Sequence, residues 1–264
     1  MKTTLKTFAI LLASTAAMTA APAHAQTAGL LAGWSGEASA SGAKTTGNTD
    51  TTDLGLALNL QKESDKWRHT FYGSADFGEA DDVQNKKRFT LGYQIDRDLT
   101  DRLYAWGNVD WFSDDFGAYE NGTFLGTGLG YKLVEPTPLG WDVEAGIGYR
   151  SQSPQLLDVP GDVTQAEFDA LDLAGDFDKQ NEFALRGASK ITYDFNDNVS
   201  LYNNSEAIYT KSDTYLWNEI GITANLMGNL AARASYRIDH HTDVLPGVEK
   251  TDTITRVGVV YSIN

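Results

Sequence analysis

The sequence has no cysteine, few basic residues and no long apolar run beyond its first segment, and each absence excludes a class of protein. Without cysteine, the chain cannot form a disulfide scaffold, a thiol nucleophile or a thiolate metal site. It carries 21 Lys and Arg residues against 36 Asp and Glu, a formal net charge of −15. This balance argues against nucleic-acid binding, because that affinity depends on Lys and Arg meeting phosphates. We therefore expect no nucleic acid among its partners.

The hydropathy of the chain excludes two further classes. No stretch after the first segment holds the roughly 18 apolar residues that a membrane-spanning helix needs. A helical membrane protein is therefore excluded, but a transmembrane β-barrel is not, because its alternating strands give only a weak average hydropathy. Disorder is excluded as well, since 41% of the residues are hydrophobic and 11% are aromatic.

Residues 1–25 have the three parts of a secretory signal peptide. Lys2 and Lys6 give a positive start, residues 7–21 are apolar and small, and a small-x-small tripeptide ends at Ala25. The alternative is an N-terminal helix that stays attached, which the short Ala-rich run disfavours. We predict export and cleavage near Ala25, which leaves residues 26–264 with 19 basic and 36 acidic side chains, a net charge of −17.

From residue 33 onward, apolar and polar residues alternate in a series of short segments. In residues 140–150, for example, every second residue from Trp141 to Tyr149 is apolar, and the residues between are charged or glycine. A sustained period of two indicates a β-strand and not a helix. The expected strands span residues 33–43, 51–62, 67–78, 87–97, 102–113, 122–134, 140–151, 181–195, 199–210, 215–226, 229–240 and 252–263.

These twelve segments are joined by two alternating kinds of connector. Tight turns are expected at residues 63–66, 98–101, 135–139, 196–198 and 227–228. Longer polar loops are expected at residues 44–50, 79–86, 114–121, 152–181, 211–214 and 241–251. Short turns on one side and long loops on the other are typical of an antiparallel up-and-down outer-membrane β-barrel. Both termini fall on the short-turn side, which we expect to be periplasmic.

Alternation alone does not distinguish this barrel from a water-soluble one, which would be apolar inside and polar outside. Three features favour the membrane. The strands are long enough to cross a bilayer at a tilt, the second face carries too many charges for a dry core, and aromatic residues lie near strand ends on the apolar face. These aromatic residues are Trp34, Trp67, Phe77, Trp111, Tyr131, Trp141, Tyr149, Phe195, Tyr209 and Tyr261.

The charged residues on the inner face need water or one another as partners. The predicted lumen-lining charges are Asp76, Asp96, Asp110, Asp142, Glu144, Arg150, Arg186, Lys190, Arg233, Arg237 and Arg256. The negatives come from the first two thirds of the chain and most positives from the last third. We therefore expect acidic and basic walls facing each other, as in a diffusion channel. The alternative is a salt-bridge network that fills the barrel, since twelve strands give an intermediate width. The pattern leaves the register of residues 199–210 open, because it puts Tyr202 and Ile208 on the inner face.

Residues 152–181 form the only long connector, and it is acidic. Its carboxylates are Asp158, Asp162, Glu167, Asp169, Asp172, Asp176 and Asp178. A capping-box pattern from Thr164 to Glu167, followed by apolar residues at helical spacing, predicts a short helix at the outer mouth. The segment is interpreted either as a constriction with cation preference or as a solvated surface loop. No metal site is expected, because the spacing of a calcium-binding EF-hand is absent.

An enzyme is the least favoured interpretation. The adjacent His240 and His241 lie near Asp239 and Asp243, which would suit a metal or a hydrolase dyad. A nucleophile motif such as Gly-x-Ser-x-Gly is missing, however, and neighbouring residues on a strand point to opposite faces. We expect no catalytic residue and no cofactor, and a hydrolase is kept only as a minor alternative.

Short motifs occur in order at residues 33–36, 47–49, 93–96, 99–105, 114–116, 126–132 and 146–150. Taken together, this series resembles one known family, the YdiY-like salt-induced outer-membrane proteins, a domain of unknown function. The resemblance implies an integral barrel in a Gram-negative outer membrane and a link to salt or osmotic conditions, and it supplies no site residues. The function expected is a narrow, porin-like diffusion channel, with a non-conducting structural or adhesion barrel as the alternative. Expected partners are outer-membrane lipid, lipopolysaccharide, the barrel-assembly machinery and small solutes or ions.

Overall fold

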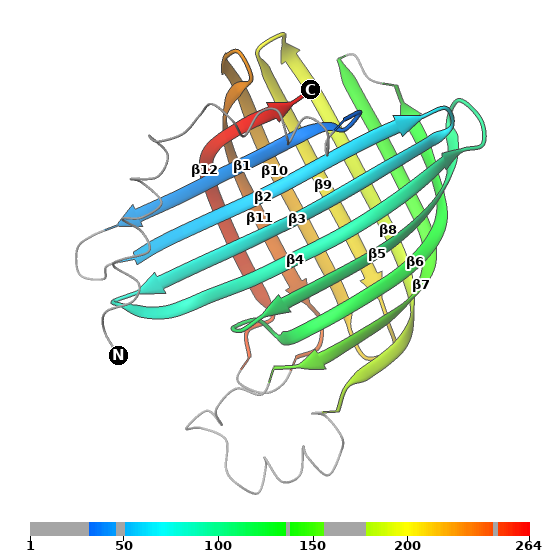
Figure 1. The fold of residues 1–264 in the computed structure, drawn as a ribbon. Coiled ribbons are helices and arrows are strands. Elements are labelled where there is room, and N and C mark those ends of the chain that lie inside the picture. The colour runs from blue at the N-terminus through cyan, green and yellow to red at the C-terminus, as the bar shows by residue number, and fades with distance from the viewer. Residues whose placement is uncertain (1–31, 46–50, 136–137, 156–177, 245–247) are drawn as a thin grey trace, which may run out of the picture.

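The computed structural model describes residues 32–45, 51–135, 138–155, 178–244 and 248–264, and these form one closed antiparallel barrel (Figure 1). Each strand pairs with its sequence neighbours, and the first strand pairs with the last. The predicted fold class is therefore confirmed. The strands are β1 (Ser35–Thr45), β2 (Thr51–Ser64), β3 (Trp67–Ala80), β4 (Val83–Asp98), β5 (Leu103–Asp114), β6 (Tyr119–Val134), β7 (Leu139–Pro154), β8 (Gln180–Asn196), β9 (Val199–Tyr209), β10 (Thr214–Met227), β11 (Leu230–His241) and β12 (Thr251–Ile263).

Every predicted strand is present, but several extend further than the alternation indicated. The largest difference concerns residues 79–86, which were predicted to form a loop. β3 continues to Ala80 and β4 begins at Val83, so that only Asp81 and Asp82 form the turn. Both turn residues have positive φ angles, 49° and 62°, as expected of a two-residue hairpin turn. The prediction was wrong because these strand ends are polar, and polarity does not separate a loop from a strand that extends beyond the lipid.

Connections at the two ends of the barrel differ in length. At the short-turn end, the breaks between strands cover residues 65–66, 99–102, 135–138, 197–198 and 228–229. At the loop end, they cover residues 46–50, 81–82, 115–118, 155–179, 210–213 and 242–250. The C-terminus lies at the short-turn end (Figure 1). Among the described residues, no helix is long and apolar enough to cross a membrane.

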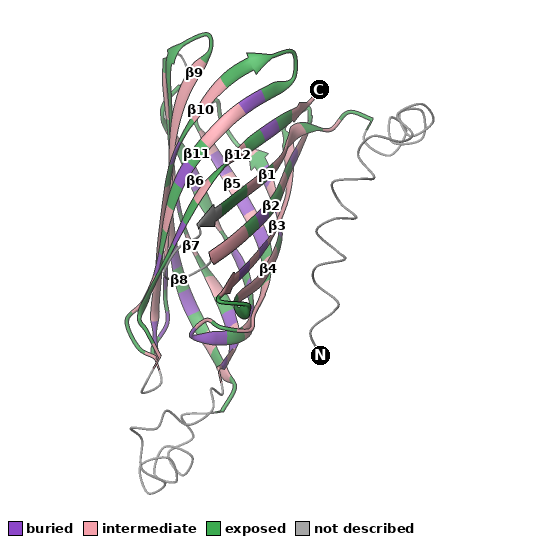
Figure 2. Cartoon of the chain, turned by 90° about the vertical axis from the view of Figure 1, so that its left-hand side faces the viewer, coloured by how far each residue is buried: buried purple, intermediate pink, exposed green. Residues whose placement is uncertain are grey.

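The outer face of the barrel is apolar and the inner face is polar. On β8, the outward Leu185 is 58% exposed, whereas its inward neighbours Ala184 and Arg186 are only 4% and 6% exposed. Exposed and buried residues alternate in this way along many of the strands (Figure 2). A water-soluble barrel would have the opposite polarity. Because the closed sheet also leaves no unpaired edge, the arrangement satisfies the requirements of a barrel surrounded by lipid.

Exposed aromatic side chains lie on the outer face near both ends of the barrel. Those near the short-turn end are Trp67, Tyr131, Trp141, Phe195 and Tyr261, and those toward the loop end are Trp111, Tyr149 and Tyr209. Trp and Tyr prefer the two interfaces of a bilayer, where one part of the ring meets lipid and the polar atom meets water. Two such belts are expected of a membrane barrel.

The structure gives β9 a defined register. Tyr202 faces the lumen, where its hydroxyl donates a hydrogen bond to Glu219 Oε1 at 2.7 Å. Ile208 also faces inward and packs against Phe124 and Ala184. The two residues that made the sequence pattern ambiguous are therefore inside the barrel.

Candidate functional site in the barrel lumen

The candidate site is the barrel lumen. Strand register brings the predicted lumen charges to its inner side, from Asp76 on β3 to Arg256 on β12. The inner side also carries Asp96, Asp110, Asp142, Glu144, Arg150, Arg186, Lys190, Arg233 and Arg237. These residues face the lumen because directly paired residues on neighbouring strands point to the same side of the sheet, as do residues two positions apart on one strand. Their neighbours determine whether the lumen is filled or open.

One side of the lumen is packed with aromatic side chains. Tyr104 and Trp106 on β5 and Phe124 on β6 point inward and are 1%, 2% and 4% exposed. They lie over glycines of β6 and β7. A Cβ added at Gly130 would lie 2.1 Å from Tyr104 Cζ, and one added at Gly146 would lie 2.4 Å from Trp106 Cζ2. The glycines are thus required for the close approach of the rings, which fill this half of the lumen.

Glu144 on β7 is the centre of a buried hydrogen-bond cluster on that packed side. Its carboxylate accepts hydrogen bonds from Arg186 Nη1 at 2.7 Å and Lys190 Nζ at 3.2 Å. It also accepts hydrogen bonds from Gln94 Nε2 at 3.1 Å and the Tyr104 hydroxyl at 3.0 Å. Gln94 comes from β4, three strands away. Side chains therefore cross this part of the lumen and hold its walls together.

Arg186 extends the same cluster to β9. Its Nε donates to Glu206 Oε2 at 2.6 Å, while its guanidinium lies 4.5 Å from the centre of the Trp106 ring. A buried guanidinium needs such partners, because an unpaired ion in this environment would cost several kcal/mol. The pairing and the cation–π contact explain how a residue that is only 6% exposed retains its charge.

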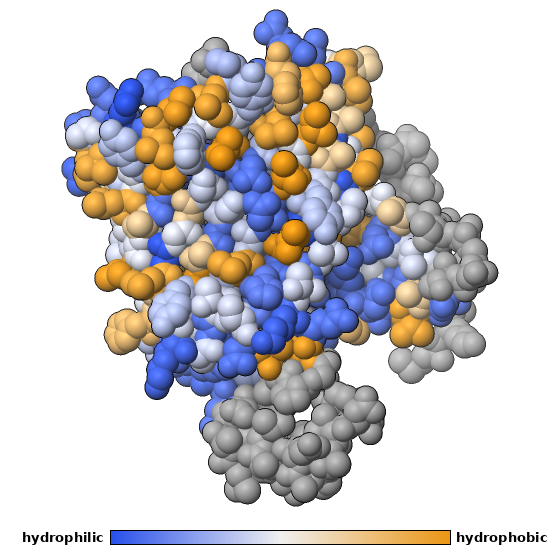
Figure 3. All heavy atoms as spheres, turned by 180° about the vertical axis from the view of Figure 1, so that it is seen from behind, coloured by the Kyte–Doolittle hydropathy of each residue, from blue (hydrophilic) through white to orange (hydrophobic). Residues whose placement is uncertain are grey.

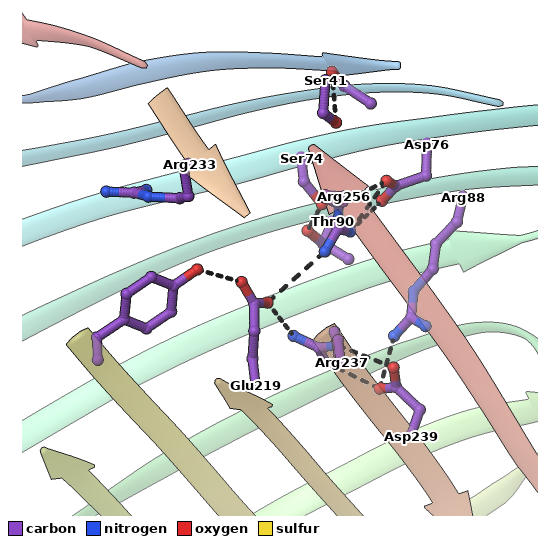
Figure 4. A network of polar contacts seen from close by, with 12 residues as sticks. Ser41, Ser74, Asp76, Arg88, Thr90, Glu219, Arg233, Arg237, Asp239 and Arg256 are labelled. Atoms are coloured by element: carbon purple, nitrogen blue, oxygen red, sulfur yellow. Dashed lines mark hydrogen bonds and ion pairs between the residues drawn. The ribbon is translucent and has the colours of Figure 1, made fainter. Parts of the chain in front are cut away.

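A second set of six alternating charges crosses the lumen, and we call it the charge chain: Asp76, Arg256, Glu219, Arg237, Asp239 and Arg88 (Figure 4). Asp76 on β3 accepts hydrogen bonds from Arg256 Nη2 on β12, with both carboxylate oxygens at 2.9 Å. Arg256 Nη1 lies 3.6 Å from Glu219 Oε2 on β10. This half of the charge chain therefore joins three strands that are not neighbours of one another in the sheet.

The other half of the charge chain returns across the lumen. Arg237 Nη1 lies 4.0 Å from Glu219 Oε2, and its Nε donates to Asp239 Oδ2 at 2.8 Å. Arg88 Nη2, which comes from β4, lies 3.5 Å from Asp239 Oδ1 and 3.5 Å from the Tyr215 hydroxyl on β10. Arg88 thus contacts the opposite wall, and the charge chain spans the lumen from β4 to β11.

The charges do not form separate acidic and basic walls, so that expectation was wrong. Acidic Glu206, Glu219 and Asp239 lie among the arginines of β8–β12, and Arg68 and Arg88 lie among the acids of β3–β5. The two signs are interleaved because each ion needs an opposite charge within reach. Much of the transverse field is therefore cancelled locally.

The lumen wall formed by β1 and β2 is different, because its inward side chains are small. Ser39 and Ser41 on β1 face the lumen together with Gly55 and Ala57 on β2. Ala57 and Asn59 are exposed although the register turns both toward the interior. An exposed residue on the inner face of a closed barrel indicates solvent space inside it. The lumen is therefore accessible to solvent beside Ala57 and Asn59, whereas Gly55 on the same strand is buried.

At the loop end, Asp213 ties two loops together. It lies between β9 and β10 and accepts hydrogen bonds from the backbone N–H groups of Thr242 at 3.0 Å and Asp243 at 3.2 Å. Its Oδ2 lies 2.6 Å from His241 Nδ1 and 3.6 Å from Arg150 Nη1. Burial raises the pKa of the Asp213 carboxyl, but the His241 hydrogen bond, the nearby Arg150 and the backbone donors outweigh burial and lower this pKa below its ordinary value.

The two adjacent histidines do not form one site. His241 faces inward, and its ring stacks on Tyr215 with centroids 4.8 Å apart. His240 faces outward, where its Nδ1 lies 2.8 Å from Thr251 Oγ1. His69, on the outer face of β3, lies 2.7 Å from the Tyr93 hydroxyl. Within the described ranges, no group of three or more His, Asp or Glu side chains could hold a metal ion.

The acidic loop falls mostly outside the described residues. The predicted short helix and the carboxylates Asp158, Asp162, Glu167, Asp169, Asp172 and Asp176 all lie in residues 156–177. Asp178 is described, and it is exposed.

Sequence reasoning missed several residues that complete the lumen contacts. Arg88 and Asp239 share the parity of the predicted inward residues on their own strands, so the alternation contained the signal for both. Asp213 had no such signal, because it lies in a loop. Its role follows from the loops that meet around it and not from any local pattern.

Comparison with known proteins gives a family and a set of barrels. A family profile described as "Protein of unknown function, DUF481" matches residues 38–263. No curated protein matches the chain. The NanC porin is 10% identical with a TM-score of 0.48, over 86% of this chain and 100% of that one.

Two further structures are similar at a comparable level. The translocator domain of the autotransporter NalP from Neisseria meningitidis is 14% identical with a TM-score of 0.43, over 86% of each chain. The COG4313 outer membrane channel from Pseudomonas putida F1 is 8% identical with a TM-score of 0.45, over 87% of this chain and 94% of that one. Similarity at this level says nothing about what this chain binds or transports.

Proposed function

The chain belongs to the DUF481 family of proteins of unknown function, and we propose that it is an outer-membrane β-barrel that acts as a narrow diffusion channel for small ions. The observation that carries this proposal is the half-filled lumen. Inward-facing Ala57 and Asn59 are exposed on the β1–β2 wall, while the aromatic residues of β5 and β6 pack the other half. The water-accessible half provides a path, and the packed half keeps it narrow.

The charge chain crosses the lumen beside this path. Arg256, Glu219 and Arg237 keep 21%, 19% and 19% of their side chains exposed, so these ions are partly hydrated and not sealed in a dry core. Hydrated charges of both signs would let small ions pass while excluding larger solutes. We expect a small conductance with weak charge selectivity, because positive and negative groups alternate.

Two variants with opposite expected effects test the channel in planar bilayers. Ala57→Trp adds bulk to the wet side of the lumen and should lower the single-channel conductance. The double variant Asp76→Ala/Arg256→Ala removes a pair without leaving an unpaired ion, and it should raise the conductance. Ala40→Trp is the matched control. Ala40 is exposed on the outer face, so this substitution adds the same volume toward lipid and not into the lumen.

The second candidate is a non-conducting structural or adhesion barrel that acts through its outer loops. The buried cluster around Glu144 favours it, since side chains from β4 and β7 meet inside the lumen there. Wild type and the Asp76→Ala/Arg256→Ala variant would then both be closed at all voltages. That result would overturn the channel proposal in favour of this one.

The location and partners proposed here follow from the outer surface. An apolar belt with aromatic residues toward both ends suits a bacterial outer membrane, reached after export and cleavage near Ala25. Outer-membrane lipid, lipopolysaccharide and the barrel-assembly machinery are the partners that such a location requires. A link to salt or osmotic conditions rests on family resemblance alone. It predicts that the amount of the protein in the membrane changes with external salt.

A further inference from the structure

A polar patch interrupts the lipid-facing surface of β8, β9 and β10. We call it the amide patch, and it consists of Ser189, Asn203, Ser205 and Asn218. Strand register places all four on the outer face. Along their strands, they alternate with the inward residues Lys190, Asn204 and Glu219, which pair across the ladders. Each is partly exposed. Sequence alternation would place apolar residues at these positions.

The amide patch lies within the apolar belt and not at its edge. Along the outer faces of the same strands, Leu185, Tyr209 and Leu216 lie on its loop-end side, and Ile191, Leu201 and Ile222 lie on its short-turn side. The outer surface seen from behind shows hydrophilic residues among hydrophobic ones over this part of the barrel (Figure 3). Lipid tails offer no hydrogen bonds to such groups, so their exposure to acyl chains is unfavourable.

The polar atoms of the amide patch are arranged as a reciprocal pair. Asn203 Nδ2 donates to Asn218 Oδ1 at 3.2 Å, and Asn218 Nδ2 donates to Asn203 Oδ1 at 3.2 Å. Asn218 Nδ2 also lies 2.7 Å from Ser205 Oγ, and Ser189 Oγ accepts from Trp141 Nε1 at 3.0 Å. Asn203 Oδ1 also accepts a hydrogen bond from the Ser205 hydroxyl at 3.3 Å. Asn218 Oδ1 has a second lone pair, so the patch can accept a further hydrogen bond from a polar partner there.

A groove of about 540 Å³ is lined in part by three residues of the amide patch, Ser189, Ser205 and Asn218. Its lining includes the small outward residues Gly187, Ser189, Ser205 and Ala207, and it is bordered by larger apolar side chains such as Leu216 and Ile238. Small residues at a surface within the membrane allow the backbones of two proteins to approach closely, and polar side chains there form hydrogen bonds across the contact. The groove and the patch together therefore have the composition of a protein–protein contact inside a membrane.

We propose that the amide patch and its groove are the contact surface for a second copy of this chain. A partner must bring hydrogen-bonding groups to the same depth in the bilayer. A second copy inserted in the same direction carries the same patch at the same depth. A two-fold axis along the membrane normal then places the two patches against each other. Asparagine and serine both donate and accept, so the surface is self-complementary, as a two-fold contact requires. Leu216 or Ile238 of one copy would fill the groove of the other.

The absence of cysteine makes a direct test possible with single-cysteine variants. Ser205→Cys at the centre of the patch should form a disulfide-linked dimer when the protein is oxidised in native-like membranes. Leu56→Cys is the matched control, because Leu56 is 55% exposed to lipid on β2, five strands from β9 in the barrel. It should give no dimer under the same oxidant.

A second measurement does not depend on crosslinking. The mass of the protein in mild detergent should correspond to two chains for wild type and to one chain for Asn203→Leu/Asn218→Leu, which replaces the amides with groups that lipid accepts. Equal crosslinking of both cysteine variants, or a wild-type mass of one chain, would overturn the proposal. A single chain that retains a bound lipid would identify an acyl chain as the occupant of the groove. None of these outcomes depends on whether the lumen conducts.

Discussion

At the scale of single residues, the lumen keeps its charges by giving each buried ion several partners. Glu144 is 5% exposed and accepts hydrogen bonds from Arg186, Lys190, Gln94 and Tyr104. In such a site, the net gain from the pair is modest, but the loss of one partner is costly because the other ion stays buried. The loss of folding stability caused by a substitution here therefore comes mainly from the ion that stays buried without its partner, and less from the hydrogen bond that is removed.

Glu144→Gln keeps the shape of the side chain and removes its charge. Arg186 and Lys190 then lose their shared carboxylate, although Arg186 keeps Glu206. We expect the free energy of unfolding to fall by about 3 kcal/mol, the lower part of the range for a broken buried pair. Urea titration of the folded barrel in detergent, read by gel migration of unheated samples, measures this change.

Glu120→Gln is the control for that measurement, since Glu120 on β6 is exposed. It should change the free energy of unfolding by less than about 0.5 kcal/mol. If both variants lost the same stability, the cluster around Glu144 would not be a stabilising centre.

At the scale of elements, the sequence pattern predicted which segments are strands and which face of most strands points outward. It could do so because lipid on one side and a lumen on the other impose a period of two. The pattern was ambiguous on β9, where polar Asn203 and Ser205 face outward while Tyr202 and Ile208 face inward. The alternation of apolar and polar residues cannot predict outward polar side chains whose hydrogen bonds are satisfied by another protein or by each other.

The loops of the barrel are held by contacts that no local pattern contains, and Asp213 provides their test. Its pKa is lowered in the folded protein. The stability that it contributes is therefore complete above the pKa of an unfolded aspartate, about 3.9, and is lost as the pH falls through the lower folded value. The difference in unfolding free energy between wild type and Asp213→Asn should be constant near neutral pH and should shrink below about pH 4.

The same titration on Asp178→Asn serves as the comparison, because Asp178 is an exposed aspartate of the loop end. This variant should match wild type throughout. A difference for Asp213→Asn that persisted unchanged to pH 3 would show that the side chain acts through shape and not through charge.

At the scale of the whole molecule, the contacts across the lumen were beyond the reach of sequence analysis. Parity places Arg88 and Asp239 inside, but it does not say that β4 and β11 lie close enough for their side chains to meet at 3.5 Å. That distance depends on barrel width, strand tilt and the size of every side chain between them. The sequence could therefore predict a charged lumen, while the choice between separate walls and interleaved pairs required the closed structure.

Closure itself depends on the seam where β1 meets β12. This ladder runs from Gly36 to Ser41 on β1, and it is shorter than the ladder from Ser35 to Thr45 that joins β1 to β2. Gly258 lies in the seam, and a Cβ there would be 2.1 Å from the Ala40 carbonyl oxygen. Gly258→Val should therefore prevent β12 from pairing with β1, because the clash is with backbone that cannot move without breaking the ladder.

The expected result is a chain that inserts poorly, runs at the same position on a gel with and without heating, and is digested by added protease. Gly107→Ala is the matched control within a complete ladder, since its nearest contact would be 3.8 Å away. It should remain heat-modifiable and protease-resistant. If Gly258→Val also folded normally, the seam would tolerate a local shift and closure would be secured elsewhere, by the ion pairs that join β12 and β11 to β3 and β1 through the lumen.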